Sequence, residues 1–209
     1  MSVARPGKIV GVGRNYREHA AELGNTVPSH PLLFLKPATT VIADGAAIVL
    51  PPESTQVEFE GEIGVVIGRR LRRASEDTAR AAIAGLTCVN DVTARDLQRS
   101  DEQWTRAKGF DTFCPLGPRV VTVESGRFAE LEVFCRVNGV ERQHGRARDM
   151  VFAIPTLVAF ISQVMTLEPG DLIATGTPSG VGPLRAGDVV EVEIPGVGLL
   201  RNPVIAEAP

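Results

Sequence analysis

The chain has 209 residues, of which 44% are hydrophobic and 22% are charged. These values are typical of a folded globular protein and exclude a disordered chain. The formal net charge is −3, and the chain has one Trp and one Tyr, which argues against a nucleic-acid-binding surface and against attraction to an anionic membrane.

Three widely spaced cysteines, Cys88, Cys114 and Cys135, do not form a pattern typical of disulfides or of a zinc site. We therefore expect reduced thiols and a cytoplasmic location. The N-terminus lacks the apolar stretch of a signal peptide. The most apolar segment, residues 150–165, is interrupted by Pro155 and is too short and too polar to span a bilayer. It predicts a helix that faces the core, with no membrane association.

The first predicted elements are a strand over residues 8–13 and a short helix over residues 16–23. Asn15 has the position of an N-cap, Glu18 follows three residues later as in a capping box, and Gly24 predicts the end of the helix. Short strands, each ended by a proline, are expected over residues 32–35 and 46–50.

The segment from Val57 to Ile67 predicts a strand with three carboxylates on one face. Glu58, Glu60 and Glu62 alternate with other residues, and a period of two places them on the same side. On an edge strand such carboxylates are simply solvated, but the apolar residues that follow are typical of a central strand. Crowded carboxylates there need a cation, or one of them must be protonated. Asp91, at the end of a later strand, can complete a site for a hard divalent ion.

The remaining predicted elements include more strands than helices. In chain order they are a helix capped by Ser75 that runs to about Leu86, a strand over 87–92, a helical turn over 93–99, a hairpin of 131–137 and 140–143 joined by Asn138-Gly139, and strands over 171–175, 188–194 and 198–204. The strands do not alternate regularly with helices. This pattern predicts an α+β, mostly β fold, a mixed β-sheet roll with a few short helices in one domain over residues 1–209.

Two glycine motifs do not identify a nucleotide site. Gly11-Val12-Gly13 lacks the third glycine of a dinucleotide motif, because position 16 is Tyr16. The segment 176–182 is not followed by Gly-Lys-Ser/Thr. It predicts a tight turn or, with the Thr177 hydroxyl, a cradle for a small anion.

Single polar residues also have plain structural interpretations. His19 and Glu22 share one face of the short helix and would form an exposed pair there. Lys108, taken alone, would be a surface lysine.

Taken together and in this order, the segments resemble the fumarylacetoacetate hydrolase family. The matching segments are Gly11–His19, Phe34–Pro37, Val57–Gly64, Asn90–Gln98, Lys108–Asp111, Asn138–Gly139 and Gly176–Gly182. They extend over nearly the whole chain, which is most similar to the short single-domain members, the acylpyruvate hydrolases and oxaloacetate decarboxylases. The resemblance implies a β-sandwich-like roll, a homodimer, and a small anionic 2-oxo acid as substrate.

The resemblance also implies roles for nine residues. The metal ligands, for Mg²⁺ or Mn²⁺, are Glu60, Glu62 and Asp91, which leaves Glu58 outside the metal's ligands. The catalytic residues are His19, Glu22 and Lys108, with His19 and Glu22 on a candidate lid over residues 15–30. The substrate-binding residues are Arg95, Gln98 and Thr177.

Three functions follow from these roles, in order of preference. The first is a metal-dependent hydrolase that cleaves the C–C bond of 2,4-diketo acids of the acylpyruvate or fumarylpyruvate type, the divalent ion stabilising the enolate that is released. The alternative is a decarboxylase, tautomerase or isomerase of oxaloacetate-like or aromatic-catabolic 2-oxo dicarboxylates, of the 5-oxopent-3-ene-1,2,5-tricarboxylate decarboxylase or 2-hydroxyhepta-2,4-diene-1,7-dioate isomerase type. The third is a non-catalytic domain that binds keto acids.

Overall fold

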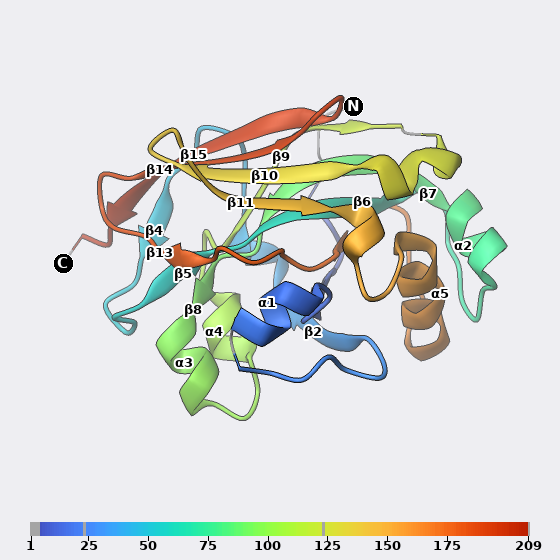
Figure 1. Cartoon of the computed structure of the whole chain (residues 1–209), viewed down its shortest axis with the longest axis horizontal. Coiled ribbons are helices and arrows are strands. Elements are labelled where there is room, and N and C mark those ends of the chain that lie inside the picture. Colours follow the sequence, from blue (N-terminus) through green and yellow to red (C-terminus); the bar gives the residue numbers. More distant parts are fainter. Residues whose placement is uncertain (1–4, 23, 123, 209) are drawn as a thin grey trace.

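A computed structural model describes residues 5–22, 24–122 and 124–208 and stacks two sheets face to face (Figure 1). The larger sheet has seven strands, in the order β2 (Leu32–Lys36), β1 (Ile9–Gly13), β12 (Leu172–Ala174), β6 (Gly61–Ile67), β7 (Ile83–Asn90), β9 (Cys114–Val121) and β3 (Val41–Ile42). The second has five, in the order β11 (Val140–Arg146), β10 (Glu132–Val137), β14 (Val189–Ile194), β15 (Gly198–Ala206) and β4 (Ile48–Leu50).

A small third sheet joins β13 (Gly182–Pro183), β5 (Val57–Phe59) and β8 (Thr93–Ala94). The helices are short and lie around the sheets: α1 (Arg17–Glu22), α2 (Glu76–Ala81), α3 (Arg95–Ser100), α4 (Thr105–Gly109) and α5 (Ile154–Val164), with 3₁₀ turns at 38–40, 125–130 and 147–149. In Figure 1, α1, α3 and α4 lie on one side of the stacked sheets, and α2 packs against α5 at one end. The α+β, mostly β prediction is therefore confirmed.

The core lies between the two large sheets. Ile63 and Leu86 of the larger sheet, and Val133, Val192 and Leu200 of the smaller one, belong to one buried apolar cluster. The strand β6 is buried along nearly its whole length, as expected for a central strand. This burial excludes the interpretation of Glu62 as a solvated residue on an edge strand.

Several predicted boundaries are wrong. The helix expected from Ser75 to about Leu86 ends at Ala81, because the chain from Ile83 onward pairs with β6 instead. The alanines of this segment are good helix formers, but pairing in the central sheet outweighs that local preference. The strand β9 was not predicted, since its two prolines argue against a strand.

The short N-terminal helix occurs as α1, but Asn15 has another function than capping. Its side-chain amide donates to the carbonyl oxygens of Phe152 and Thr175, and its Oδ1 accepts from the Phe152 N–H at 2.9 Å. Asn15 therefore ties the start of α1 to two distant segments. The predicted helix end at Leu23 lies outside the described residues.

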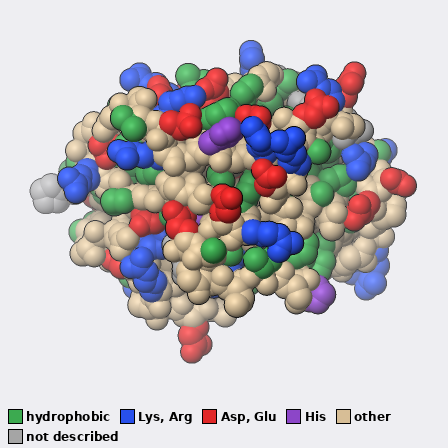
Figure 2. All heavy atoms as spheres, in the orientation of Figure 1, with side chains coloured by type: hydrophobic (Ala, Val, Ile, Leu, Met, Phe, Trp, Pro, Cys, Tyr) green, Lys and Arg blue, Asp and Glu red, His purple; other side chains and the backbone are tan. Residues whose placement is uncertain are grey.

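The surface gives no sign of a large basic or apolar patch on the face shown in Figure 2, where acidic and basic side chains are interspersed. In the described ranges, no helix is long and apolar enough to cross a membrane.

Candidate active site

The chain passes from the small sheet into the large one at Glu60. The strand predicted from Val57 to Ile67 is interrupted there, since β5 ends at Phe59 and β6 begins at Gly61. The Glu60 N–H donates to Asn90 Oδ1 at 2.9 Å, and the Asp91 N–H donates to the Glu60 carbonyl at 2.8 Å. These bonds hold the start of β6 beside the end of β7, which brings Glu60 next to Asp91.

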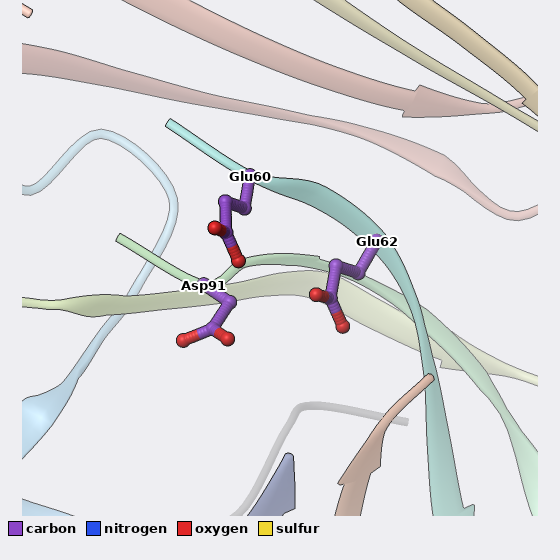
Figure 3. Close-up of side chains that lie close together, drawn as sticks. All are labelled: Glu60, Glu62 and Asp91. Carbon is purple, nitrogen blue, oxygen red and sulfur yellow. The ribbon is translucent and has the colours of Figure 1, made fainter. Parts of the chain in front are cut away.

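Three carboxylates converge at this junction. Oxygens of Glu60, Glu62 and Asp91 all lie within 4.8 Å of one another, and Figure 3 shows the three side chains pointing into the same space. Their residues are only 4%, 1% and 1% exposed, respectively. Like charges so close together in a buried site repel one another strongly, so the group requires compensation by cations.

Two buried lysines supply part of this compensation. Lys108 Nζ donates to Glu60 Oε2 at 2.8 Å and to Asp91 Oδ2 at 2.6 Å. Lys36 Nζ lies 2.7 Å from Asp91 Oδ1 and donates to the Val92 carbonyl. Burial lowers the pKa of Lys108, but the charges of Asp91 and Glu60 outweigh it and raise that pKa overall. Lys108 is thus held as an ammonium ion.

Arg95 forms the third cationic contact. Its Nε donates to Glu58 Oε2 at 2.7 Å and its Nη2 to Glu60 Oε1 at 2.6 Å. Its Nη1 donates to Gln98 Oε1 at 2.5 Å. Glu58 is not one of the three clustered carboxylates, and its ion pair balances Arg95.

Glu62 is the carboxylate that the cations leave uncompensated. Its Oε2 accepts a hydrogen bond from the Gly176 N–H at 2.8 Å. Burial, then the charges of Asp91 and Glu60, raise its pKa well above the usual range. By contrast, Lys108 and Arg95 overcome the effect of burial at Glu60 and lower its pKa.

The donor set fits a hard divalent cation. The cluster holds four buried carboxylates, including Glu58, against the three cations Lys36, Arg95 and Lys108. A dication would compensate Glu62, and carboxylate oxygens are the ligands that Mg²⁺ and Mn²⁺ prefer. Glu60, Glu62 and Asp91 are the residues that would hold it.

A histidine and a glutamate lie across from the triad on α1. His19 Nδ1 is 3.3 Å from Glu22 Oε2, and His19 is buried although the helix itself is at the surface. Glu22 also accepts from the Gly180 N–H at 3.0 and 3.2 Å. The loop after β12 therefore fixes Glu22, and Glu22 orients the imidazole.

All nine predicted site residues line one cavity of about 420 Å³. They are His19, Glu22, Glu60, Glu62, Asp91, Arg95, Gln98, Lys108 and Thr177. The structure thus brings together residues from α1, β6, α3, α4, the β5–β6 and β7–β8 junctions and the loop after β12. The interpretation of Lys108 as a surface lysine is wrong.

Thr177 is fixed by a buried glutamine that the sequence did not single out. Gln143 accepts from the Gly61 N–H at 2.9 Å and donates to Thr177 Oγ1 at 2.8 Å and to the Pro178 carbonyl at 2.8 Å. Thr177 in turn donates to the Gly61 carbonyl at 3.0 Å. Gln143 therefore clamps Gly61, which lies between Glu60 and Glu62 in the sequence, to the loop that carries Thr177.

We expect Gln143→Leu to destabilise the protein by about 2–3 kcal/mol, because it leaves the buried Gly61 N–H without its partner. Denaturant unfolding measures this change. Gln163→Leu is the matched control, since Gln163 is exposed and bonds a single carbonyl, that of Ala74. Equal losses of unfolding free energy in the two variants would contradict the proposed role of Gln143 in holding Gly61.

Sequence reasoning also missed Lys36. It lies in the segment Phe34–Pro37, which was matched to the family without a role for the lysine. The available signal was a lysine at the end of an apolar strand, directly before Pro37. Its partner Asp91 is 55 positions away, so the ion pair itself has no local pattern.

Comparison with known proteins gives a consistent match over nearly the whole chain. The family model described as "Fumarylacetoacetate (FAA) hydrolase C-terminal" matches residues 8–205. Oxaloacetate tautomerase YisK of Bacillus subtilis is 44% identical, over 97% of this chain and 71% of its own.

Two solved structures have the same fold. The 5-carboxymethyl-2-hydroxymuconate delta-isomerase from Mycobacterium smegmatis superposes with a TM-score of 0.90 and 45% identity, covering 98% of this chain and 81% of that one. The 2-hydroxyhepta-2,4-diene-1,7-dioate isomerase from Mycobacterium marinum gives 0.89 and 47%, covering 98% and 77%.

Proposed function

Because this chain belongs to the fumarylacetoacetate hydrolase family, we propose that it is an isomerase of small 2-oxo dicarboxylates, of the oxaloacetate tautomerase type. The observation that carries the proposal is the cavity in which a buried triad of carboxylates faces an oriented histidine. The names of the similar proteins support tautomerisation or isomerisation in preference to the C–C hydrolysis that the sequence favoured first.

Tautomerisation requires one proton to leave carbon and another to reach oxygen. Glu22 is a carboxylate, so we assign the proton of His19 to Nδ1, where it bonds Glu22. This assignment leaves Nε2 as a base that takes a proton from the carbon beside the ketone. The carboxylate of Glu22 stabilises the imidazolium that results. The enolate oxygen then takes its proton from solvent and the imidazolium releases its proton to solvent, so His19 returns to its starting state.

Negative charge develops on the ketone oxygen as that proton leaves. Lys108 uses two of its three N–H donors on Glu60 and Asp91. Its third N–H donor is available to the ketone oxygen of a substrate in the cavity that Lys108 lines. A divalent cation on the triad, when bound, supplies Lewis acidity that favours this charge. Thr177 and Gln98 line the same cavity and position the substrate.

The test is a direct rate measurement with oxaloacetate. We expect the protein to accelerate the interconversion of the enol and keto forms, followed by the absorbance of the enol, in the presence of Mg²⁺ or Mn²⁺. A chelator should return the rate to that of the uncatalysed reaction. Acetylpyruvate serves as the hydrolase substrate in parallel assays, and faster cleavage of acetylpyruvate than tautomerisation of oxaloacetate would restore the hydrolase interpretation.

A further inference from the structure

Two glycines of β1 let aromatic rings form one wall of the cavity. A Cβ at Gly11 would lie 2.2 Å from the Phe34 ring, and a Cβ at Gly13 would lie 2.8 Å from the Trp104 ring. Side-chain atoms do not approach so closely, so only glycine lets these rings lie against the strand. This packing explains the Gly-x-Gly motif that the nucleotide interpretation did not fit.

The wall runs from the buried lysine toward solvent. Lys108 Nζ lies 4.8 Å from the centroid of the Phe34 ring, and Phe34 meets Trp104 edge-on at 5.5 Å between centroids. The Arg14 guanidinium carbon then lies 6.0 Å from the Trp104 centroid. Since Lys108 is buried and Arg14 is half-buried, Arg14 forms the outer end of the wall.

Arg14 is held in an unusual backbone conformation. Its φ is +57°, in the left-handed region that arginine rarely adopts. Such a conformation persists only where surrounding contacts enforce it. The Trp104 ring and the tether at Asn15 provide these contacts, and together they keep the guanidinium at the cavity.

Arg14 also differs from the inner cations in its charge balance. Lys108 and Arg95 are neutralised by carboxylates of the cluster. Among the residues that the structure describes, no carboxylate oxygen lies within ion-pair distance of Arg14. A half-buried guanidinium that lines a cavity without an anionic partner is suited to bind a ligand carboxylate, which it can do with two parallel hydrogen bonds.

We propose that Arg14 binds the distal carboxylate of the substrate and thereby selects dicarboxylates over monocarboxylates. This inference rests on the proposed function, because it places the 2-oxo end of the same molecule near the triad and Lys108. The substrate class is a short 2-oxo acid with a second carboxylate, and both Lys108 and Arg14 line the cavity that would hold it.

The experiment compares two stable ligands of the same carbon skeleton, malate and 2-hydroxybutyrate, which differ in the distal carboxylate. Their Kd values are measured by calorimetry with Mg²⁺ present. We expect Arg14→Gln to weaken malate binding about 10- to 100-fold, as for loss of a charge-assisted hydrogen bond, and to change 2-hydroxybutyrate binding by less than about twofold. Arg14→Lys should restore part of the affinity.

Trp104 gives a second readout, since it is the single Trp of the chain. Malate should change its fluorescence in the parent protein and much less in Arg14→Gln. Arg17→Gln is the matched control, because Arg17 is exposed on α1 and borders a different cavity. It should leave both affinities unchanged.

Equal weakening of the two ligands in Arg14→Gln, or equal affinity of the parent protein for both, would overturn the assignment. The measurement needs no turnover, so it is independent of the proposed reaction. Selective malate binding without oxaloacetate tautomerisation would refute the proposed function and leave the role of Arg14 intact.

Discussion

Glu62→Gln is expected to abolish the response of the protein to divalent metal. In the parent protein, an ion at 100 times its Kd should add about 2.7 kcal/mol to the free energy of unfolding. The variant lacks the carboxylate that the buried cations leave uncompensated, so the same ion should add little. Activity should fall at least about 100-fold, since even changes beyond the ligands themselves can cost that much.

In the metal-free protein, by contrast, Glu62→Gln should increase the free energy of unfolding. Burial and the neighbouring charges of Asp91 and Glu60 raise the pKa of Glu62 above its ordinary value of 4.5. Between these two pKa values the folded state binds more protons than the unfolded state, so this residue makes stability fall as pH rises. Glu62→Gln removes that contribution, so the variant should be more stable than the parent protein at neutral pH when a chelator keeps both free of metal.

Glu58→Gln is the matched control, because Glu58 is equally buried in the cluster but lies outside the triad. It should keep the thermal shift with Mg²⁺ or Mn²⁺, measured by calorimetric unfolding with and without chelator. A full metal response in Glu62→Gln, or a lost response in Glu58→Gln alone, would show that the ion binds elsewhere.

The candidate metal ligands could be predicted from the sequence because they lie in short segments with a recognisable local pattern. The alternation of Glu58, Glu60 and Glu62 with other residues indicated that the carboxylates lie on one side of the chain, and Asp91 at the end of a later strand could complete their site. The resemblance then implied that Glu60 and Glu62, and not Glu58, join Asp91. The hairpin also follows from local sequence, since Asn138 and Gly139 both adopt the positive φ that a two-residue turn requires.

The contacts that fix the site were not predictable, because they join residues far apart in the chain. Gln143 meets Gly61 across 82 positions, and Asn15 meets Phe152 across 137. Neither polar residue has a periodic pattern around it. The early end of α2 has the same cause, since pairing of β7 with β6 outweighs a local preference for helix.

Lys108→Met and Lys36→Met are expected to destabilise the protein similarly but to affect catalysis differently. The two lysines hold opposite oxygens of Asp91, with Lys108 at Oδ2 and Lys36 at Oδ1. Removing either one leaves a buried carboxylate short of a cation, which should cost about 3–5 kcal/mol in the free energy of unfolding. Denaturant unfolding of the metal-free proteins measures this loss.

The catalytic consequences differ because Lys108 is one of the residues that line the cavity, whereas Lys36, which pairs with the other oxygen of Asp91, is not. At saturating metal, kcat for oxaloacetate should fall about 100- to 1000-fold in Lys108→Met, as for loss of a group that stabilises an oxyanion. It should fall less than about tenfold in Lys36→Met. Lys108→Arg, which retains the charge, should recover stability more fully than kcat.

Lys8→Met controls for the loss of a lysine as such, because Lys8 pairs with Asp171 and its side chain is 27% exposed. Its cost should be smaller, and kcat should not change. Equal falls of kcat in Lys108→Met and Lys36→Met would mean that both lysines act only by holding Asp91. The charge facing the developing oxyanion would then have to come from another group of the cavity.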